Sequence, residues 1–432
     1  MTLSVSSAGS ARIQSYQGSY RSGTGVSVSA SIILTFASLG AMILNPIFGT
    51  YAALIFIACG GLLTALRPAG TVLILLRFWY VLLLPAFCLL STLWSQFPAV
   101  SMRHGIQLCV TFIIAVVLAN RISAREFVRG LFAIYSIGVV LSLLIGDVRQ
   151  DIGAWIGIFR SKNAFAAFVA VYTLLCVAIS IDRNLPIFLR WVGLAGFMVS
   201  LPLLILAQSV GAMLMTIPAV IVAFGLHTTR RLRNPHKLLL VGFLLLAAVS
   251  VAIILSAYGN VLFASLLERS GKDPNLTGRT DLWAFGRYMI EENFWLGVGY
   301  QAFWVQGYGP AEAFWSMFNI ASRSGFNFHN TYISNAVEIG VLGVFMQVLM
   351  LYGALLLCTF AALRSRSSEM IFLTSFLIFI SLASFVEVAI FFQFSVTTIV
   401  VICALVFGVR HWCTTKQSEP LVTRYEEEAA RF

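Results

Sequence analysis

Histidine and arginine residues at the edges of apolar segments are the first candidates for chemistry. His329 lies in "FHNTYISNAVEIGVLG", residues 328–343, at the start of a long apolar run, and the 432-residue chain has only five histidines. Because an imidazole titrates near neutral pH, His329 could accept a proton from an attacking hydroxyl group. The alternative is that His329 and Asn330 are interfacial capping residues with satisfied hydrogen bonds, and the histidine taken alone favours that interpretation.

Cationic residues could bind phosphate at two further places. Arg279, in "GRTDLW", lies at the predicted N-terminus of a helix. Free backbone N–H groups and the helix dipole favour anions there, and a guanidinium adds a forked donor for phosphate oxygens. The ordinary alternative is a salt bridge from Arg279 to Asp281 or Glu268. Arg160 and Lys162, in "GIFRSKNAFAAF", precede another apolar segment and could either bind phosphate or anchor lipid head groups.

Two acidic residues near the last apolar segments have less obvious roles. Glu338 lies nine residues after His329 inside an apolar segment, where an acidic side chain is a functional candidate. A helix turns by about 100° per residue, so Glu338 should point away from His329. Support of helix packing is therefore an equally good interpretation. Glu387 is expected to mark the turn between the last two spans.

The composition excludes a soluble globular domain. Apolar residues make up 59% of the chain and charged residues only 10%, and the mean hydropathy is +0.91, values typical of a multi-pass membrane protein. The formal net charge is +11, but the arginines are scattered over short connections. We therefore expect orientation charges on membrane loops and no nucleic-acid partner. The seven cysteines include no C-x-x-C pair, which supports neither a disulfide framework nor a zinc site.

The apolar segments predict the fold. Each span needs about 20 apolar residues, and its backbone must satisfy its own hydrogen bonds, so helices are expected. The predicted fold class is an all-α polytopic membrane protein with about 12 transmembrane helices and a large, partly helical periplasmic cap loop. The predicted spans lie near residues 28–45, 47–66, 71–93, 105–120, 127–146, 164–181, 190–207, 211–226, 238–257, 330–360, 370–386 and 389–409.

Basic residues in short connections set the predicted orientation, since cytoplasmic loops are enriched in Lys and Arg. Three basic connections, "NRISAREFVR", "HTTRRLRNPHK" and "ALRSRSSE", fall on the cytoplasmic side together with both termini. The predicted regions are a disordered N-terminal tail (1–27), spans one to nine (28–257), the periplasmic cap (258–329), spans ten to twelve (330–409) and a C-terminal tail (410–432). On this topology only His104 and His329, of the five histidines, lie on the outer side.

The predicted cap is expected to be folded. It contains four of the nine tryptophans, which is too much apolar surface to leave solvated. The segment "TGRTDLWAFGRYMIEE" predicts a helix with Thr280 or Thr277 as its N-cap and Asp281 in its first turn. The turn-forming "LGVGY" should end this helix.

The order of these motifs resembles a known family. The pairing of "GRTDLWAFGRYMIEENFWLGVGYQAF" with "HNTYISNAVEIGVLG" resembles the O-antigen ligase and Wzy-type polysaccharide polymerase superfamily. "WSQFPAVS" and "GIFRSKNAFA" are similar to motifs of its exopolysaccharide polymerase branch, and the resemblance extends from about residue 71 to 400. Many members have a Ser-Arg pair before the eighth span, where this chain reads "AQSVGA". A phosphate contact made there in relatives is therefore missing or supplied by Arg160.

The resemblance implies a glycosyltransferase of the bacterial inner membrane, with its active site on the periplasmic face. Its donor would be an undecaprenyl-diphosphate-linked oligosaccharide, and it would use no metal, cofactor or nucleotide sugar. The implied catalytic residues are His329, which orients or deprotonates the acceptor hydroxyl, and Arg279, which binds the diphosphate. Further expected contacts to the diphosphate or glycan are Arg160, Lys162, Asn163, Arg287 and Asn330. Expected partners are an acceptor glycan, membrane lipids, a flippase and a chain-length regulator.

Several functions fit this pattern. Inverting polymerisation of exopolysaccharide or O-antigen repeat units is favoured by the "SKN" motif, whereas an O-antigen ligase would use lipid A-core as the acceptor. A transporter or flippase for the same lipid-linked glycan would be expected to contain inverted repeats and charged midplane sites. This chain instead has one large asymmetric cap. A structural subunit of an envelope complex, with the cap as a docking surface, is the third alternative.

Overall fold

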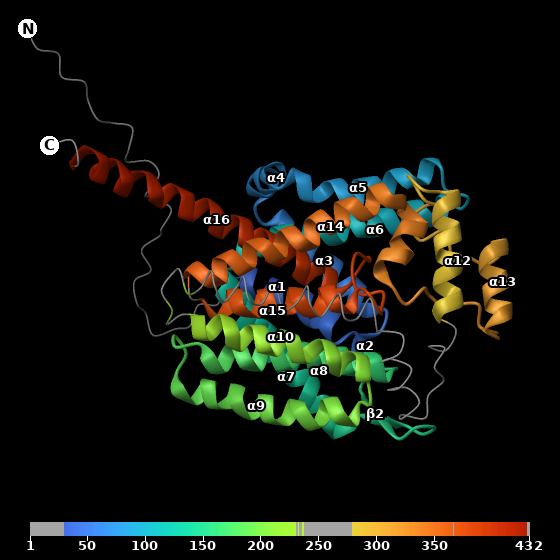
Figure 1. Cartoon of the computed structure of the whole chain (residues 1–432), viewed down its shortest axis with the longest axis horizontal. Coiled ribbons are helices and arrows are strands. Elements are labelled where there is room, and N and C mark those ends of the chain that lie inside the picture. The colour runs from blue at the N-terminus through green and yellow to red at the C-terminus, as the bar shows by residue number, and fades with distance from the viewer. Residues whose placement is uncertain (1–29, 230–231, 233–235, 237–278, 366, 430–432) are drawn as a thin grey trace, which may run out of the picture.

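The protein is a bundle of long helices with two shorter helices across one end (Figure 1). The computed structural model describes residues 30–229, 232, 236, 279–365 and 367–429. The predicted N-terminal tail, the predicted span 238–257, Glu268 and Thr277 lie outside these residues. Within the described part, seven helices are long and apolar enough to cross a membrane, or up to eight if one bent pair counts as a single span. The all-α polytopic fold class is thus confirmed, whereas the number 12 is not.

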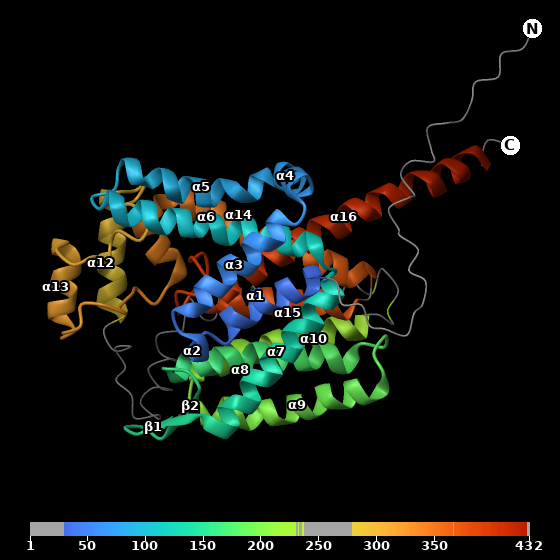
Figure 2. The ribbon, with the colours of Figure 1, turned by 180° about the vertical axis from the view of Figure 1, so that it is seen from behind.

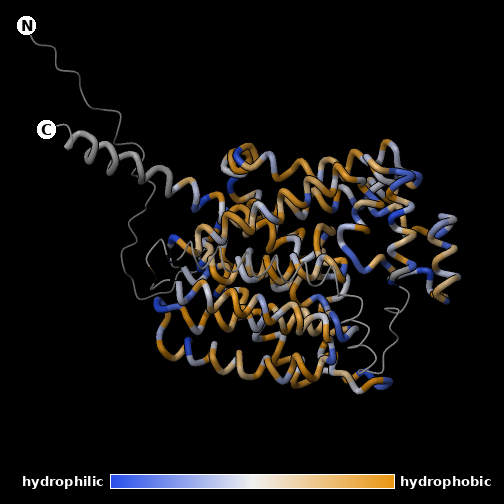
Figure 3. The backbone as a smooth tube through the Cα atoms, viewed as in Figure 1, coloured by the Kyte–Doolittle hydropathy of each residue, from blue (hydrophilic) through white to orange (hydrophobic). Residues whose placement is uncertain are grey.

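The spans after residue 97 agree well with the predicted segments. They are α6 (Pro98–Arg121), α7 (Ala124–Ile145), α8 (Lys162–Ile181), α9 (Ile187–Leu206), α10 (Val210–Thr229), α14 (Thr331–Ser365) and the first part of α16 (Val396–Ala429). Exposed apolar side chains such as Leu144 (75% exposed) and Leu356 (72%) lie on the outside of the bundle. Such side chains suit contact with lipid tails. Figure 3 shows that hydrophilic residues gather at the ends of the helices.

The N-terminal third is more broken than predicted. It contains α1 (Ala30–Ile43), α2 (Asn45–Phe48), α3 (Tyr51–Ala65), α4 (Pro68–Arg77), the 3₁₀ helix η1 (Trp79–Leu82), α5 (Leu83–Leu90) and η2 (Ser91–Leu93). The prediction of one continuous span over 71–93 is therefore wrong. Proline disfavours a helical residue before it, and Arg67 has φ −144° and ψ 73°. As a result, α3 and α4 meet at 100°.

The connections fall at two opposite ends of the bundle. At one end, Arg129 pairs with Asp182 at 3.1 Å, and Arg125 pairs with Glu369 at 3.9 Å. Arg410 donates to the carbonyl of Ala119 at the same end, at 2.7 Å. Figure 2 shows the other end, where α12 and α13 lie across the bundle and the short hairpin β1–β2 lies beyond α8. The two basic connections that the structure describes, near Arg125 and before Glu369, therefore lie away from the cap.

The hairpin was not expected from the sequence. Strands β1 (Asp147–Arg149) and β2 (Ala154–Gly157) pair antiparallel inside the connection before α8. Gly153 in the turn has φ +64° and Gly157 has φ +55°, conformations that glycine adopts without steric penalty. The hairpin leads directly into Arg160 and the start of α8.

The described part of the cap has its own apolar core. Helices α12 (Arg279–Glu292) and α13 (Gly309–Met317) pack together, and the Phe285 and Phe314 rings lie 4.4 Å apart between centroids. Trp304 contacts aromatic rings on several sides, whereas Trp295 is 62% exposed. The predicted helix with Asp281 in its first turn is confirmed. Thr280 lies inside α12, so it cannot be the N-cap.

Helix α14 is broken near its start. Gly340 has φ +63° and ψ −177°, which interrupts the helical backbone. The turn after α12 docks into this break, where the Gly299 N–H donates to the Glu338 carbonyl at 2.8 Å and the Val341 N–H donates to the Phe294 carbonyl at 2.9 Å. A Cβ on Gly340 would clash with the Trp295 carbonyl oxygen. The predicted "LGVGY" turn is thus present, and it supports the first turns of α14.

The last connection is longer than the sequence indicated. Helix α15 (Ser368–Ala383) ends early, and α16 begins at Val396, although a span was predicted from residue 389. Residues 384–395 form an irregular segment with positive φ at Phe391 and Phe394. Thr398 satisfies part of this backbone by accepting from the N–H groups of Phe391 and Phe392. This segment carries Glu387 to the end of the bundle that faces the cap. Beyond residue 409, α16 continues through most of the predicted C-terminal tail.

Candidate active site

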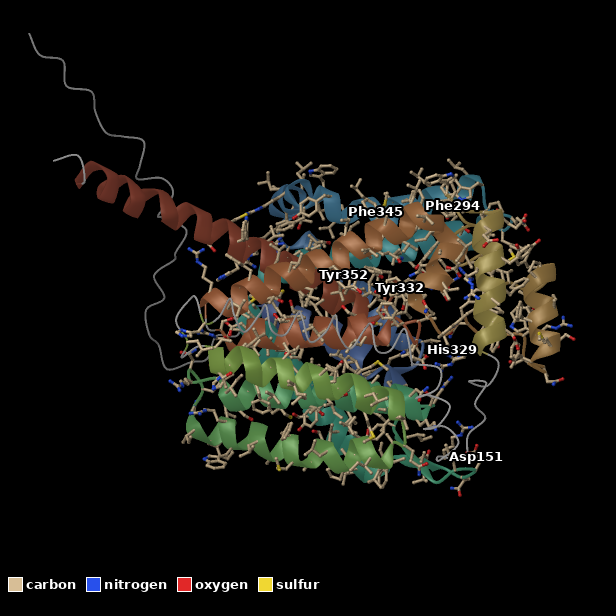
Figure 4. All side chains as sticks on the ribbon, in the orientation of Figure 1. Asp151, Phe294, His329, Tyr332, Phe345 and Tyr352 are labelled. Carbon is tan, nitrogen blue, oxygen red and sulfur yellow. The ribbon has the colours of Figure 1, made fainter. Side chains whose placement is uncertain are left out.

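One carboxylate joins the two residues predicted to be catalytic. Glu387 Oε2 lies 3.2 Å from His329 Nδ1, and Glu387 Oε1 lies 3.4 Å from Arg279 Nη2. The three side chains come from the start of α12, the residue pair before α14 and the segment 384–395. His329 lies at the end of the bundle, beside the cap helices (Figure 4). The structure therefore brings His329 and Arg279 together.

The backbone at His329 is held in an uncommon conformation. His329 has φ +49°, which is rare for residues other than glycine and is often found at functional sites. Its N–H donates to Asn327 Oδ1 at 2.7 Å. Trp283 donates to the neighbouring Phe328 carbonyl at 2.7 Å. These contacts fix the direction in which the imidazole leaves the chain.

Glu387 also sets the tautomer of a neutral His329. A carboxylate only accepts hydrogen bonds, so the Nδ1 atom facing it must carry the proton. The remaining nitrogen, Nε2, then has a free lone pair that can take a proton from a hydroxyl group. The His329 side chain is 31% exposed, so a substrate can reach it.

Two contacts hold Arg279 in place and leave some of its N–H donors without a partner among the described residues. Its Nη1 donates to the Val386 carbonyl at 3.1 Å, and its Nη2 contacts Glu387. A guanidinium has five N–H donors, and the others have no partner among the described residues. The side chain is 23% exposed. Arg279 can therefore keep its position and still donate to an anion. The alternative pairing of Arg279 with Asp281 is not found.

The start of α8 completes the network. Asn163 donates to Glu387 Oε1 at 3.3 Å and accepts a hydrogen bond from Ser209 at 3.1 Å. Lys162 donates to the Gln208 carbonyl at 3.3 Å, and Gln208 has φ +49°. The "AQSVGA" segment, which departs from the family pattern, thus holds two of the predicted site residues in place.

Asn330 and Thr331 have structural contacts at the same point. Asn330 Oδ1 accepts from the N–H groups of Tyr332 and Ile333, which caps α14. Its amide donates to the Phe385 carbonyl at 3.0 Å. Thr331 donates to the Glu387 carbonyl at 2.9 Å and accepts from the Ala389 N–H at 2.9 Å. These bonds tie the segment 384–395 to α14. A substrate contact of Asn330 stays a prediction.

The N-termini of several helices meet at this network. Helix α8 begins at Lys162, α10 follows Ser209, α12 begins at Arg279 and α14 follows Asn330. Each terminus contributes the positive end of a helix dipole, although the first N–H groups of α14 are already bonded to Asn330 and Ser384. Together with Lys162 and Arg279, they make this region suitable for an anion.

Two other predicted contacts lie outside the network. Arg160 and Arg287 are exposed and have no ion-pair partner in the described part of the chain. Arg287 lies eight residues after Arg279 on α12, which is about 12 Å along a helix. Whether either arginine contacts a ligand stays a prediction.

The surrounding charges keep Glu387 ionised. Burial raises the pKa of this carboxyl group, but the hydrogen bond and charge of His329 and the charge of Arg279 lower it further than burial raises it. The net result is a pKa below the ordinary value. Glu387 is therefore an anion at neutral pH and can accept hydrogen bonds from both His329 and Arg279.

Sequence reasoning placed Glu387 correctly between the last two spans but gave it no role. Its partners Asn163, Arg279 and His329 are 224, 108 and 58 residues away in the chain. No local pattern joins residues so far apart. The one available signal was that Glu387 is an acidic residue at the outer end of an apolar segment, as His329 is a basic one.

A cavity of about 650 Å³ lies beside the network. Its wall includes Asn327 and Val388, which are close in sequence to His329 and Glu387, but not His329 or Arg279 themselves. The cavity extends instead toward Arg103 and His104 of α6 and Glu338 of α14. The reactive groups thus lie at its edge.

Comparison with known proteins agrees with this arrangement. Residues 195–348 match the family model described as O-antigen ligase. This match, together with the similar relative described next, confirms the resemblance to the O-antigen ligase and Wzy-type polymerase superfamily. The exopolysaccharide production protein ExoQ of Rhizobium meliloti (strain 1021) is 33% identical over 278 residues, or 62% of this chain and 62% of that relative. The region matched by the family model contains Arg279 and His329 but ends before Glu387.

Proposed function

We propose that this protein is a glycosyltransferase that moves a glycan from an undecaprenyl-diphosphate carrier to a hydroxyl group of an acceptor glycan. The observation that carries the proposal is the contact of one carboxylate, Glu387, with both a histidine and an arginine at the end of a membrane-embedded bundle. A base and an anion-binding group held together suit a displacement in which a phosphate leaves.

Binding of the donor uses the cationic side of the network. The diphosphate contacts Arg279 and the adjacent helix N-termini, with Lys162, Asn163 and Arg160 beside it. The prenyl chain extends along the apolar helices, which places the phosphate at the depth where the lipid ends. Fixing the donor in this way converts part of a random encounter into a positioned reaction.

The chemical step is a single displacement. The acceptor oxygen attacks the anomeric carbon, and its proton passes to His329 Nε2. The bond between the anomeric carbon and the diphosphate oxygen breaks, and the electron pair leaves with the prenyl diphosphate. Attack from the face opposite the leaving group inverts the anomeric configuration. Arg279 stabilises the developing charge, and removal of one such contact commonly lowers the rate by about 10² to 10³.

Glu387 has a positioning role in this step. It keeps the Nδ1 proton on His329 so that Nε2 faces the acceptor, and it stabilises the imidazolium that forms. The reaction as proposed needs no metal ion. Arg279 and the helix N-termini supply the positive charge that a metal would supply elsewhere.

Polymerisation of repeat units is favoured over ligation to lipid A-core. The similarity to a relative named for exopolysaccharide production supports this choice, as does the "SKN" motif at the start of α8. The acceptor would then be another lipid-linked repeat. We place the reaction on the periplasmic face of the bacterial inner membrane, with both termini in the cytoplasm and with a flippase and a chain-length regulator as functional partners.

The decisive experiment uses the purified full-length protein in proteoliposomes with a lipid-linked repeat unit. Longer glycans and released undecaprenyl diphosphate are expected. His329→Ala and Arg279→Ala should each lower turnover by about 10²-fold or more. The matched controls are His236→Ala and Arg183→Ala, at exposed positions outside the site, and both should keep activity.

Two results would contradict the proposal. Full activity in both site variants would remove the assigned roles of His329 and Arg279. Movement of the intact lipid-linked donor across the bilayer, without exchange of the glycosidic bond, would instead identify a transporter.

A further inference from the structure

The cavity beside the network contains groups that the proposed reaction does not use. Glu338 is only 5% exposed and lines the cavity wall. Its Oε2 accepts from the backbone N–H of Gln301 at 3.0 Å and from the Gln301 side-chain amide at 3.3 Å. No described residue donates to its Oε1. Because Glu338 lines the cavity, Oε1 can accept from an N–H or O–H group of a ligand there.

The position of Glu338 is fixed on both sides. Gln301, its partner, has φ +58°, and the Gly299 N–H donates to the Glu338 carbonyl. The break at Gly340 begins two residues later. The carboxylate therefore lies on a rigid junction between the cap turn and α14, as a recognition group requires.

Another part of the cavity wall, at α6, contributes the cationic Arg103, which contacts a chain of neutral side chains. Arg103 Nη2 lies 3.1 Å from His104 Nε2, and His104 Nδ1 lies 2.8 Å from the Gln393 side-chain amide. Arg103 can only donate, so His104 Nε2 accepts, and Nδ1 must carry the proton. The side-chain oxygen of Gln393 must then face His104 Nδ1, and its nitrogen must face Tyr300. This assignment exchanges the oxygen and nitrogen of the Gln393 amide, which have nearly the same shape. Tyr300 in turn donates to the Phe391 carbonyl at 3.1 Å.

This arrangement leaves the charge of Arg103 directed at the cavity. No carboxylate in the described part of the chain pairs with it. The wall also includes amide side chains and aromatic rings, among them Gln306, Asn327, Trp304 and Phe326. Amides and carboxylates pair with hydroxyl groups, and aromatic faces pack against the C–H groups of a sugar ring.

We infer that this cavity is a saccharide-binding site that holds the acceptor glycan, with Glu338 and Arg103 as its recognition residues. Only the identification of the bound glycan as the acceptor rests on the proposed function. Its volume of about 650 Å³ lies within the range of small-molecule sites, about 300–1,000 Å³. Asn327 and Val388 place one end of the cavity next to the His329–Glu387 pair, so a sugar held there presents a hydroxyl group to the base.

The test is equilibrium binding to the full-length protein in nanodiscs. The probe is a lipid-free, fluorescently labelled oligosaccharide cut from the exopolysaccharide of the source strain. The unmodified protein should bind it. Glu338→Gln, which keeps the shape of the side chain, and Arg103→Gln should each weaken binding by at least about 10-fold, the loss expected for one charged hydrogen bond. Binding of undecaprenyl phosphate in the nanodisc should not change in either variant.

A second pair of variants protects against misfolding of the buried site. Gln306→Trp places a large ring at an exposed position on the cavity wall, and Met317→Trp places the same ring at an exposed position of α13 outside the wall. The first should abolish binding and the second should leave it intact. If Glu338→Gln lowers the melting temperature, the binding measured for Gln306→Trp and Met317→Trp decides whether the cavity holds the saccharide.

The outcomes separate this inference from the proposed function. No binding to the unmodified protein, or equal binding by Glu338→Gln, Arg103→Gln and Gln306→Trp, would overturn the inference even if transfer is observed. Glu338-dependent binding without any transfer would support a saccharide site and contradict the glycosyltransferase proposal.

Discussion

At the scale of residues, the central feature is a single carboxylate that contacts both a histidine and an arginine. Glu387 contacts His329 through one oxygen and Arg279 and Asn163 through the other. Such sharing fixes both partners relative to each other, which the proposed displacement requires because base and leaving group act on opposite sides of one carbon atom. The side chain is 35% exposed, so its contribution is to geometry more than to stability.

Replacement of Glu387 by glutamine tests this positioning role. Glu387→Gln keeps the size of the side chain but no longer enforces the Nδ1–H tautomer of His329, so kcat should fall by about 10²-fold or more while KM for the donor changes little. The measurement is the rate of undecaprenyl diphosphate release. Glu369→Gln, in the ion pair with Arg125 at the far end of the bundle, is the control and should leave the rate unchanged. A Glu387→Gln enzyme with normal kcat would show that the tautomer is set elsewhere.

The pH dependence of stability follows from the lowered pKa of Glu387. A group with a lower pKa in the folded state contributes stability above its unfolded pKa, and this contribution is lost as the pH falls through the folded value. The difference in melting temperature between the unmodified protein and Glu387→Gln should therefore be present at neutral pH and disappear only below the ordinary value of 4.5. Thermal unfolding in detergent over a series of pH values measures it. A difference that grows as the pH falls would have the wrong sign.

Part of this candidate site could be predicted from the sequence. His329 and Arg279 could be predicted because each residue combines a reactive type with a local signal, the start of an apolar run or of a helix. Glu387 has a local signal too, at the end of an apolar segment, but its role depends on contacts across 58 to 224 residues. The role of Glu338 could not be predicted either, because its rotation away from His329 on a helix fitted packing as well as chemistry. The break at Gly340 and the turn around Gln301 give it a cavity of its own.

At the scale of elements, the broken start of α14 is the feature that positions the site. The short piece before Gly340 carries Asn330, Thr331 and Glu338, and the turn of residues 293–301 replaces the helical hydrogen bonds lost at the break. Tyr332 and Tyr352 join the two pieces through a hydroxyl contact of 2.9 Å, and both are labelled in Figure 4. The first piece is thus fixed to the cap as firmly as to its own helix.

Substitution of Gly340 should loosen this junction. Gly340→Ala places a Cβ against the Trp295 carbonyl and requires a positive φ, which alone costs about 1–2 kcal/mol for a residue with a side chain. We expect a lower melting temperature and faster proteolysis of the cap. Gly353→Ala, on the same helix with nothing within 4 Å of the added atom, should be neutral or slightly stabilising. Equal effects of the two substitutions would argue against the junction.

The element boundaries could be predicted where the chain is regular and not where it bends. Spans from α6 to α10 follow apolar runs that end at charged or polar residues, so their positions match. The break at Phe78 (φ −109°, ψ 26°) interrupts the apolar stretch 71–93, which was predicted as one span, and the segment 384–395 is apolar although it is not helical. Hydropathy reports burial or contact with lipid, but it does not report whether the backbone is helical.

At the scale of the whole molecule, the connections are sorted between two ends. The connections around Arg125 and Asp182 meet at one end, and those with His329, Arg279, Glu387 and the start of α8 meet at the other. The helices α12 and α13 cover the second end (Figure 1). This sorting agrees with the predicted order of connections, while the side of the membrane that each end faces stays a prediction.

Chemical labelling tests which side each end faces. In a variant without the native cysteines, Asp151→Cys on the hairpin and Arg183→Cys between α8 and α9 lie at exposed positions at opposite ends. A membrane-impermeant maleimide should label Asp151→Cys in spheroplasts and Arg183→Cys only after permeabilisation, because basic connections stay in the cytoplasm. The reverse pattern would place the candidate active site in the cytoplasm.

The late position of Glu387 in the chain has a consequence for biogenesis. Synthesis proceeds from the N-terminus, so a nascent polypeptide that has already inserted α6 to α14 holds His329 and Arg279 but not the acid that aligns them. If the protein acts as proposed, competence for transfer would begin only after the last hairpin, α15 and α16, enters the bilayer. A ribosome-stalled or prematurely terminated product would therefore be inert toward the cell's supply of prenyl-linked sugars.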